Sequence, residues 1–378
     1  MTDSSEEGHP ARVHFAGRAG PFLLMQLWRA FLSLVTLGIH RFWWRTANRR
    51  RLWEETTIDG DPLEYRGRGM ELLLGTLLAF FIVFLPLGVV GQLPQWLQLT
   101  GAESGPALAV AAAMPLLALL VVGFLVGYAV WRSRRYLLSR TSWRGIRAGM
   151  AGNGWAYARL HFRMLALQFL TLGLATPYAQ ARRWNALWSD ARFGTEPFDA
   201  AVAWRPLLRP WLLSLGIAAV LFLVPLLVAL PAALGAAGLE ELLQPDQIPD
   251  AGQERAILIL FVGLIVALVV VSLLLPLAFV PWRAAFLRAA VGATRLGDLR
   301  FAFAATPSHW LWYLLGNAAL VILTLGLGAL LLPWRQWEFW TTHLRISGAL
   351  DEETIRQSRL VAPSHGDGLA EGFDLGGI

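Results

Sequence analysis

The chain has 378 residues, of which 56% are hydrophobic and only 15% are charged, with a mean hydropathy of +0.50. Soluble domains carry about 25% charged residues, so this composition is typical of a membrane protein. The net charge is +6, and all 32 basic residues are Arg because the sequence contains neither Lys nor Cys. These absences exclude Schiff-base lysines, P-loop lysines, disulfides, thiolate metal sites and cysteine nucleophiles.

One short phrase, Thr-Leu-Gly followed by Ile or Leu, occurs three times, each time at the end of an apolar run. The copies are residues 36–39, 171–174 and 324–327, and two long apolar stretches lie between successive copies. Self-similarity of this kind indicates a repeated architecture. We therefore predict an all-α polytopic membrane protein, in which pseudo-repeats of a TLG segment alternate with pairs of transmembrane helices.

Seven apolar segments are candidates for membrane helices, which need about 20 apolar residues. Four are clear, and three weaker ones carry the TLG phrase. The clear segments are residues 72–90, 107–130, 211–230 and 256–280; the TLG segments are residues 22–39, 160–175 and 310–332.

Arginine distribution predicts the orientation, because short Arg-rich loops stay cytoplasmic. Residues 91–106 contain no Arg and residues 231–254 are acidic, whereas the segments flanking the clear spans are Arg-rich. The two clear helix pairs should therefore loop to the outside and return.

The second and third TLG segments have Arg-rich segments on both sides, which leaves two alternatives. Each TLG segment either enters from the cytoplasm and turns back near its glycine (Gly38, Gly173 or Gly326), or spans the membrane against the charge rule. Glycine favours the break because it tolerates backbone angles that other residues avoid. The third segment is long enough to span, so both alternatives stay open there.

Each TLG phrase is followed by an aromatic and Arg-rich segment. In the first of these segments Trp43, Arg50 and Trp53 recur at intervals that share one helical face, with Trp expected towards lipid and Arg towards phosphates. We interpret each segment as an amphipathic helix in the cytoplasmic headgroup layer, serving either as a plain anchor or as a site for an anionic lipid or phosphate. The candidate lipid or anion contacts are Arg29, Arg45, Arg49, Arg50, Arg163, Arg182, Arg183 and Arg335. The repeat-motif residues are Thr36, Gly38, Trp43, Thr171, Gly173, Pro177, Thr324, Gly326 and Trp334.

Short β-hairpins are predicted in the basic segments. Residues 57–65 contain Asp59-Gly60, a pair that favours tight hairpin turns. Related segments lie at residues 141–147, 193–198 and 294–303 and around Gly348. We expect these hairpins to pack as small cytoplasmic caps.

Together these phrases resemble the YjgN-like family of bacterial inner-membrane proteins, a domain of unknown function. The family pattern is Phe-x-Gly, an apolar run, Thr-Leu-Gly-Ile, a Pro-Trp-Ala segment with basic residues, and a closing phrase that ends in Tyr. Phe15, Thr36, Trp43 and Tyr65 occupy matching positions here, whereas Phe42 replaces the proline. The resemblance implies a polytopic inner-membrane protein and no established activity.

No catalytic constellation is present in the sequence, so we expect no enzyme activity, cofactor or metal site. The expected partners are membrane lipids and no nucleic acid, with a protein partner or homo-oligomer left open. The protein should interact with lipid or transport a small solute. Transport predicts a continuous polar cavity bounded by Arg29, Arg163 and Asn317. The alternative is an envelope scaffold that binds a protein partner through the hairpins, at Tyr65 or Phe301.

Seven segments follow from these boundaries. They are a disordered N-terminus (1–11), a first TLG unit (12–70), a transmembrane hairpin (71–131), a second TLG unit (132–206), a second transmembrane hairpin (207–281), a third TLG unit (282–350) and a disordered tail (351–378).

Overall fold

The computed structural model describes residues 13–99, 105–237, 251–348 and 357. The expected disordered N-terminus and nearly all of the expected tail lie outside the described residues. The chain forms two compact units. The first comprises Met1–Ala203, Arg288–Ala304 and Asn317–Ile378, and the second comprises Trp204–Leu287 and Ala305–Gly316.

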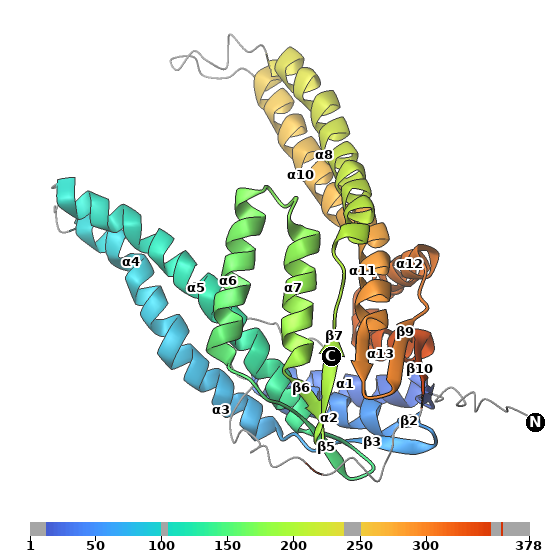
Figure 1. Ribbon diagram of the computed structural model, residues 1–378. Coiled ribbons are helices and arrows are strands. Elements are labelled where there is room, and N and C mark those ends of the chain that lie inside the picture. Colours follow the sequence, from blue (N-terminus) through green and yellow to red (C-terminus); the bar gives the residue numbers. More distant parts are fainter. Residues whose placement is uncertain (1–12, 100–104, 238–250, 349–356, 358–378) are drawn as a thin grey trace, which may run out of the picture. The chain divides into compact units, whose positions relative to one another are not determined.

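A ten-stranded antiparallel sheet lies in the first unit, so the prediction of an all-α protein is wrong (Figure 1). Each strand pairs with its neighbours in the sequence. The strands are β1 Val13–Phe15, β2 Thr56–Ile58, β3 Asp61–Tyr65, β4 Thr141–Trp143, β5 Ile146–Met150, β6 Ala191–Phe193, β7 Glu196–Ala200, β8 Thr294–Leu296, β9 Leu299–Phe303 and β10 Leu344–Ser347.

Tight two-residue turns join the strands at one end of this sheet. In the β2–β3 hairpin, Asp59 and Gly60 both have positive φ (51° and 88°), as Asp-Gly predicts. The hairpins expected near residues 141, 193 and 294 are also confirmed. They are not separate caps, because the pairings β3–β4, β5–β6 and β7–β8 join them into one sheet. Near Gly348, β10 pairs back with β9.

Helical connections join the strands at the opposite end, because consecutive antiparallel strands alternate in direction. The chain thus contains five modules of strand, helical connection and strand. The helices are α1 Ala19–Val35 and α2 Arg41–Glu54; α3 Gly69–Ala79, η1 Phe80–Phe84, α4 Leu85–Leu99 and α5 Gly105–Ser139; α6 Gly154–Leu170 and α7 Thr176–Ser189; η2 Arg205–Leu207, α8 Leu208–Ala237, α10 Ala251–Ala278 and α11 Val280–Gly292; and α12 Pro307–Leu323, η3 Leu327–Leu331 and α13 Leu332–His343.

One backbone hydrogen bond recurs in all five modules and closes each of them. The N–H after the first strand donates to the carbonyl just before the second strand. The five bonds are Ala16 to Glu55 (2.9 Å), Arg66 to Arg140 (2.8 Å), Ala151 to Asp190 (2.7 Å), Ala201 to Ala293 (3.2 Å) and Ala304 to His343 (2.8 Å). The structural repeat is therefore the five-fold module, of which the TLG phrase marks three copies.

Apolar side chains from strands across the whole sheet pack into a single cluster. Its buried members are Ala148, Phe193, Leu296, Leu299 and Ile346, and Val13 and Ile58 pack against them. Residues of β1 and β10 can share a cluster with the middle strands only if the sheet curls, and these two edges do lie next to each other. The inside of the curled sheet is thus filled with apolar side chains.

Tryptophans link neighbouring modules. Trp53 Nε1 donates to Thr141 Oγ1 (3.2 Å) and Trp184 Nε1 donates to Thr294 Oγ1 (3.1 Å). Trp337 Nε1 donates to Thr56 Oγ1 (2.7 Å), which connects the last module to the first. Trp337 also stacks on Trp53, with ring centroids 4.2 Å apart. Side chains therefore close the ring of modules where the sheet edges meet.

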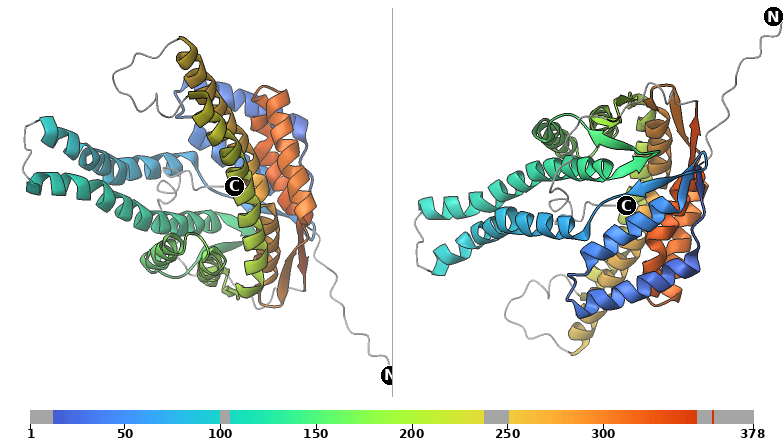
Figure 2. Two further views of the ribbon diagram at one scale, coloured as in Figure 1. Left: turned by 90° about the horizontal axis from the view of Figure 1, so that it is seen from above. Right: turned by 90° about the horizontal axis from the view of Figure 1, so that it is seen from below.

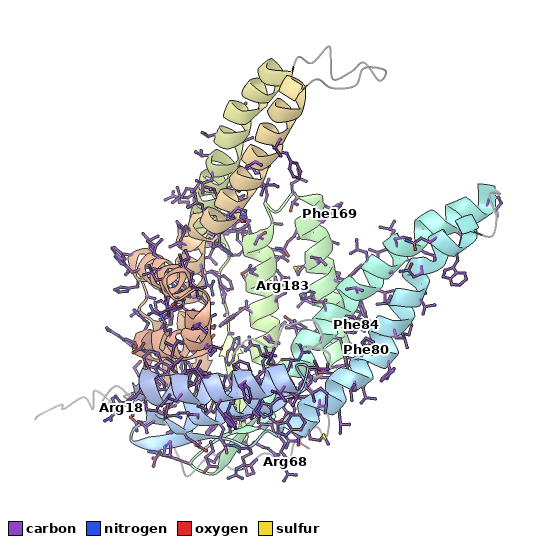
Figure 3. The ribbon with its side chains drawn as sticks, turned by 180° about the vertical axis from the view of Figure 1, so that it is seen from behind. Arg18, Arg68, Phe80, Phe84, Phe169 and Arg183 are labelled. Atoms are coloured by element: carbon purple, nitrogen blue, oxygen red, sulfur yellow. The ribbon has the colours of Figure 1, made fainter. Side chains whose placement is uncertain are left out.

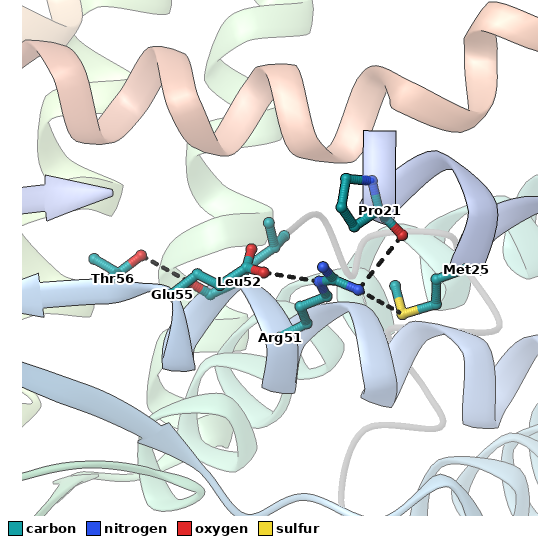
Figure 4. Close-up of polar contacts among 6 residues, drawn as sticks. All are labelled: Pro21, Met25, Arg51, Leu52, Glu55 and Thr56. Atoms are coloured by element: carbon teal, nitrogen blue, oxygen red, sulfur yellow. Dashed lines mark hydrogen bonds and ion pairs between the residues drawn. The ribbon is translucent and has the colours of Figure 1, made fainter. Parts of the chain in front are cut away.

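Polar contacts hold the first helical hairpin together near the sheet (Figure 4). Arg51 donates to Glu55 Oε1 (2.8 Å) and to the carbonyl of Pro21 (3.5 Å), which ties α2 to the start of α1. Thr56 Oγ1 donates to the carbonyl of Leu52 (2.7 Å) at the passage from α2 to β2. These bonds fix the direction in which the hairpin leaves the sheet.

Asp190 gives a prediction about pH. Burial raises the pKa of its carboxyl group above the ordinary value of 3.8, although the Trp131 indole N–H donates to it (2.8 Å). An acid with a raised pKa contributes stability below its unfolded-state pKa and loses it as the pH rises. Asp190→Asn keeps an acceptor for Trp131, so the melting temperature of the variant relative to wild type should increase as the pH rises above 3.8. A constant difference between pH 3 and pH 7 would contradict this assignment.

Within the described ranges, four helical segments are long and apolar enough to cross a membrane. They are Gly69–Gln92, Ala113–Ser139, Arg205–Val224 and Val269–Gly292, and they overlap the four clear spans expected from the sequence. Figure 2 shows α4 and α5 running side by side as a hairpin. Of the expected outer loops, residues 91–99, 105–106, 231–237 and 251–254 belong to α4, α5, α8 and α10, and residues 100–104 and 238–250 lie outside the described residues.

Candidate membrane-contacting site

Each TLG phrase forms a tight turn between two helices. The first helix of each pair ends at or just before the threonine, and the following leucine and glycine both have positive φ. The leucine angles are 50° at Leu37, 49° at Leu172 and 51° at Leu325. The chain thus reverses direction at every copy, including the third, as the first of the two alternatives predicted.

The threonine hydroxyl stabilises this turn in the same way in all three copies. Thr171 Oγ1 donates to the carbonyl of Leu167 (2.7 Å) and accepts from the N–H of Ala175 (3.1 Å). Thr36 makes the equivalent bonds (2.8 and 3.0 Å), as does Thr324 (2.6 and 2.6 Å). The hydroxyl therefore satisfies one backbone group on each side of the turn, which explains why this position carries threonine.

Large apolar side chains surround each turn and are exposed. Leu37, Leu172 and Leu325 are 94%, 90% and 94% exposed, respectively. We name the following twelve residues, which occupy equivalent positions around the three threonines, the tip cluster: Leu34, Val35, Leu37, Ile39, Phe169, Leu170, Leu172, Leu174, Ile322, Leu323, Leu325 and Leu327. Figure 3 shows Phe169 at the free end of the α6–α7 hairpin, with Arg183 nearer to the sheet.

Leucine is an unfavourable choice for the left-handed conformation, which costs about 1–2 kcal/mol for a residue with a Cβ atom. Glycine or asparagine adopts it more easily. In water an exposed leucine gains nothing in return, whereas transfer to an apolar medium is worth about 1.5–3 kcal/mol per side chain. A leucine at all three turns therefore indicates an apolar environment at the tips.

An amide side chain braces each short hairpin from inside. The Gln26 carbonyl oxygen accepts from the Trp44 indole N–H. Gln168 accepts from Arg183 (2.9 Å) and donates to Thr176 Oγ1 (3.0 Å). Asn317 Oδ1 accepts from Arg335 Nε (2.6 Å). Arg183 and Arg335, which the sequence marked as candidate lipid contacts, are thus engaged within their own hairpins.

The other predicted arginines divide between the interior and the surface. Arg49 is 2% exposed, and its guanidinium lies 6.0 Å from the Tyr65 ring centre. Arg163 on α6 and Arg182 on α7 are exposed. Arg29 and Arg45 are half-buried, and Arg50 is exposed and donates to the carbonyl of Gly67 (3.3 Å). The sequence pattern does not distinguish these roles.

The proline and tryptophan residues of the repeat motif contribute to packing. Pro177 is buried, Trp43 lies against Gly69, and Trp334 packs near Phe15 (ring centroids 6.1 Å apart). Trp53, which was expected to face lipid on an amphipathic surface helix, is 5% exposed in the protein core. That interpretation of residues 41–54 is wrong, because α2 is the returning helix of a hairpin and packs on α3 and β3.

Gly123 and Gly127 of α5 lie against α6 and fix the position of the α6–α7 hairpin along α5. A Cβ atom on Gly127 would lie 2.7 Å from His161 Cβ and 3.0 Å from Ala158 Cα, so the helices are in close contact. α5 runs towards the sheet and α6 away from it. At 1.5 Å per residue, Leu172 lies about 16 Å beyond His161, level with about residue 116 of α5. That level is inside the apolar segment Ala113–Ser139.

Sequence reasoning missed the pair Gly123 and Gly127 and the amides Gln26 and Gln168. The glycines four residues apart in an apolar helix carried a recognisable packing signal. The amides carried none, because their partners lie on another helix.

These features define a multi-pass membrane protein in which helical segments connect the strands of an antiparallel sheet. The chain belongs to the family described as bacterial protein of unknown function (DUF898), whose model matches residues 10–372. It is similar to the inner membrane protein YjgN of Salmonella typhimurium, with 29% identity over 87 residues. The match covers 23% of this chain and 22% of that protein. No solved structure matches the chain. The YjgN-like resemblance and the inner-membrane location are thus confirmed.

Proposed function

We propose that this inner-membrane protein interacts with lipid without catalysing a reaction, and that its three TLG hairpins enter the cytoplasmic leaflet and turn back within it. The observation that carries this proposal is the repeated exposed leucine in a left-handed conformation. Its cost is offset if acyl chains surround the tips.

The position of the arginines fits the thickness of one leaflet. Arg29 and Arg45 lie eight residues on either side of Leu37, and Arg163 and Arg182 lie nine and ten residues from Leu172. At 1.5 Å per residue, these guanidiniums are about 12–15 Å from the tips. Half of a hydrocarbon core of about 30 Å is about 15 Å. With the tips at the bilayer centre, the arginines reach the phosphates.

The sheet interior supports this function over transport of a small solute along the sheet axis. Its apolar filling offers no polar path. Arg29, Arg163 and Asn317 come from three different hairpins, and Asn317 is bonded to Arg335 within its own. The scaffold alternative is also less well supported, because the two residues proposed to bind a partner are engaged within the protein. Tyr65 is buried and Phe301 packs against the apolar cluster of the sheet.

A depth measurement tests the proposal. The natural chain has no Cys, so a single cysteine at Leu172 can carry an environment-sensitive fluorophore in reconstituted vesicles. We expect strong quenching by phospholipids brominated near the ends of their acyl chains and weaker quenching by phospholipids brominated near the headgroup.

The matched control is a cysteine at Thr195, in the exposed turn between β6 and β7 of the same part of the chain. It should respond to aqueous quenchers and to neither lipid. A fluorophore at Leu172 that aqueous iodide quenches as well as one at Thr195 would refute the proposal.

A further inference from the structure

Three buried side-chain nitrogen atoms between α1 and α2 have no hydrogen-bond partner among the described residues. They are Gln26 Nε2, Arg29 Nε and His40 Nε2. Buried polar groups in folded proteins are nearly always paired, so several unpaired nitrogens in one place indicate a missing group. The amide nitrogen of Gln26 and the guanidinium nitrogen of Arg29 are donors, a pair suited to an oxyanion.

These nitrogen atoms face one another across the hairpin. Gln26 and Arg29 are three residues apart on α1, and His40 and Trp44 are four residues apart around the start of α2, so each pair shares a helix face. The bond from the Trp44 indole to Gln26 shows that the two faces meet. Gln26 is completely buried, whereas Arg29 is half-buried.

The charges around this place are of one sign. Arg29 lies close enough to Arg50 and to His40 for an electrostatic interaction with each. In the described part of the chain, the ion pairs Arg51–Glu55, Arg66–Glu64, Arg140–Glu71 and Arg144–Asp61 leave Arg29 without a carboxylate partner. An unneutralised guanidinium beside buried donors favours an anionic ligand.

The α6–α7 hairpin provides an internal comparison. There the amide of Gln168 is fully engaged, with its nitrogen donating to Thr176 and its oxygen accepting from Arg183. The equivalent brace in the first hairpin uses only the oxygen of Gln26. The unpaired amide nitrogen therefore distinguishes α1–α2 from α6–α7, where the unpaired buried nitrogen is His161 Nδ1.

We propose that Gln26 and Arg29 bind a phosphate oxyanion, carried by the headgroup of an anionic phospholipid. The inference rests on the proposed function, since tips at the bilayer centre place these two residues about 12–16 Å from Leu37, at headgroup depth. The phosphate oxygens accept from the amide and guanidinium N–H groups and neutralise Arg29.

Gln26→Glu is the sharpest test. The carboxylate keeps an acceptor for Trp44 and places a fixed negative oxygen where Gln26 Nε2 stands, so it competes with the ligand. In neutral detergent, phosphatidylglycerol should raise the melting temperature of the full-length wild-type protein more than phosphatidylcholine does. This difference should disappear in Gln26→Glu and in Arg29→Gln, and persist in the matched control Arg300→Gln, which changes an exposed arginine of β9 in the sheet.

Each outcome decides the proposal. If both variants retain the wild-type difference, the site is refuted, and Arg29→Gln alone decides the matter if Gln26→Glu does not fold. If inorganic phosphate without lipid stabilises wild type but not Arg29→Gln, the oxyanion site is supported and its lipid source is overturned. The depth of Leu172 is measured on another hairpin, so a failure here leaves the proposed function standing.

Discussion

Replacing Trp337 with alanine is expected to lower the free energy of unfolding in detergent by about 2–3 kcal/mol, below the ~3–5 kcal/mol usual for a fully buried aromatic side chain because Trp337 is half-buried. The side chain stacks on Trp53 and donates to Thr56, and both contacts join the last module to the first. Its loss should open the ring where the two sheet edges meet. Thermal unfolding followed by tryptophan fluorescence gives the measurement.

Trp337→Phe separates the two contributions. Phenylalanine keeps an aromatic ring against Trp53 and loses only the bond to Thr56, so the expected cost is about 1 kcal/mol. Equal melting temperatures for wild type and Trp337→Ala would show that the modules do not depend on this closure.

Replacing Gly127 with leucine is expected to separate α5 from α6. Any Cβ at this position meets the Cα of Ala158 at 3.0 Å, and backbone atoms cannot move aside as a flexible side chain can. Overpacking costs about 1–3 kcal/mol, and the lost packing between α5 and α6 adds to it. The variant should melt well below wild type, and a fluorophore on Leu172 should change its depth because α5 no longer supports the hairpin.

Gly88→Leu is the matched control, because it lies in the same long hairpin and nothing lies within 4 Å of its added Cβ. It should melt within a degree or two of wild type. A Gly127→Leu variant as stable as Gly88→Leu would contradict the close packing of α5 on α6.

The sequence predicted the helices and tight turns well, because their signals are local. Apolar runs of sufficient length predicted the four spans, Asp59-Gly60 predicted a hairpin turn, and the TLG phrase indicated a reversal as one of two alternatives. The continuous sheet could not be predicted. Its strands have three to five residues, too few for an alternating pattern, and pairs such as Tyr65 with Thr141 are separated by a whole helical hairpin.

The candidate site was predicted only in part. The arginines and the TLG residues were identified, but the roles of Arg49, Arg183 and Arg335 depend on partners from other elements. The exposed leucine was the informative residue of the phrase. Glycine was expected to be the residue that adopts the unusual backbone angle. The adjacent Leu37, Leu172 and Leu325 also have positive φ.

Labelling from the two faces of the membrane tests the central claim most directly. Variants with a single cysteine in place of Leu325 or Thr195 are treated with a membrane-impermeant maleimide in inverted and in right-side-out vesicles. The cysteine at Thr195 should react only in inverted vesicles, and the one at Leu325 should react in neither until detergent is added. Labelling at Leu325 in right-side-out vesicles would show that the third hairpin reaches the periplasm, and a turn that ends inside the bilayer would then be ruled out.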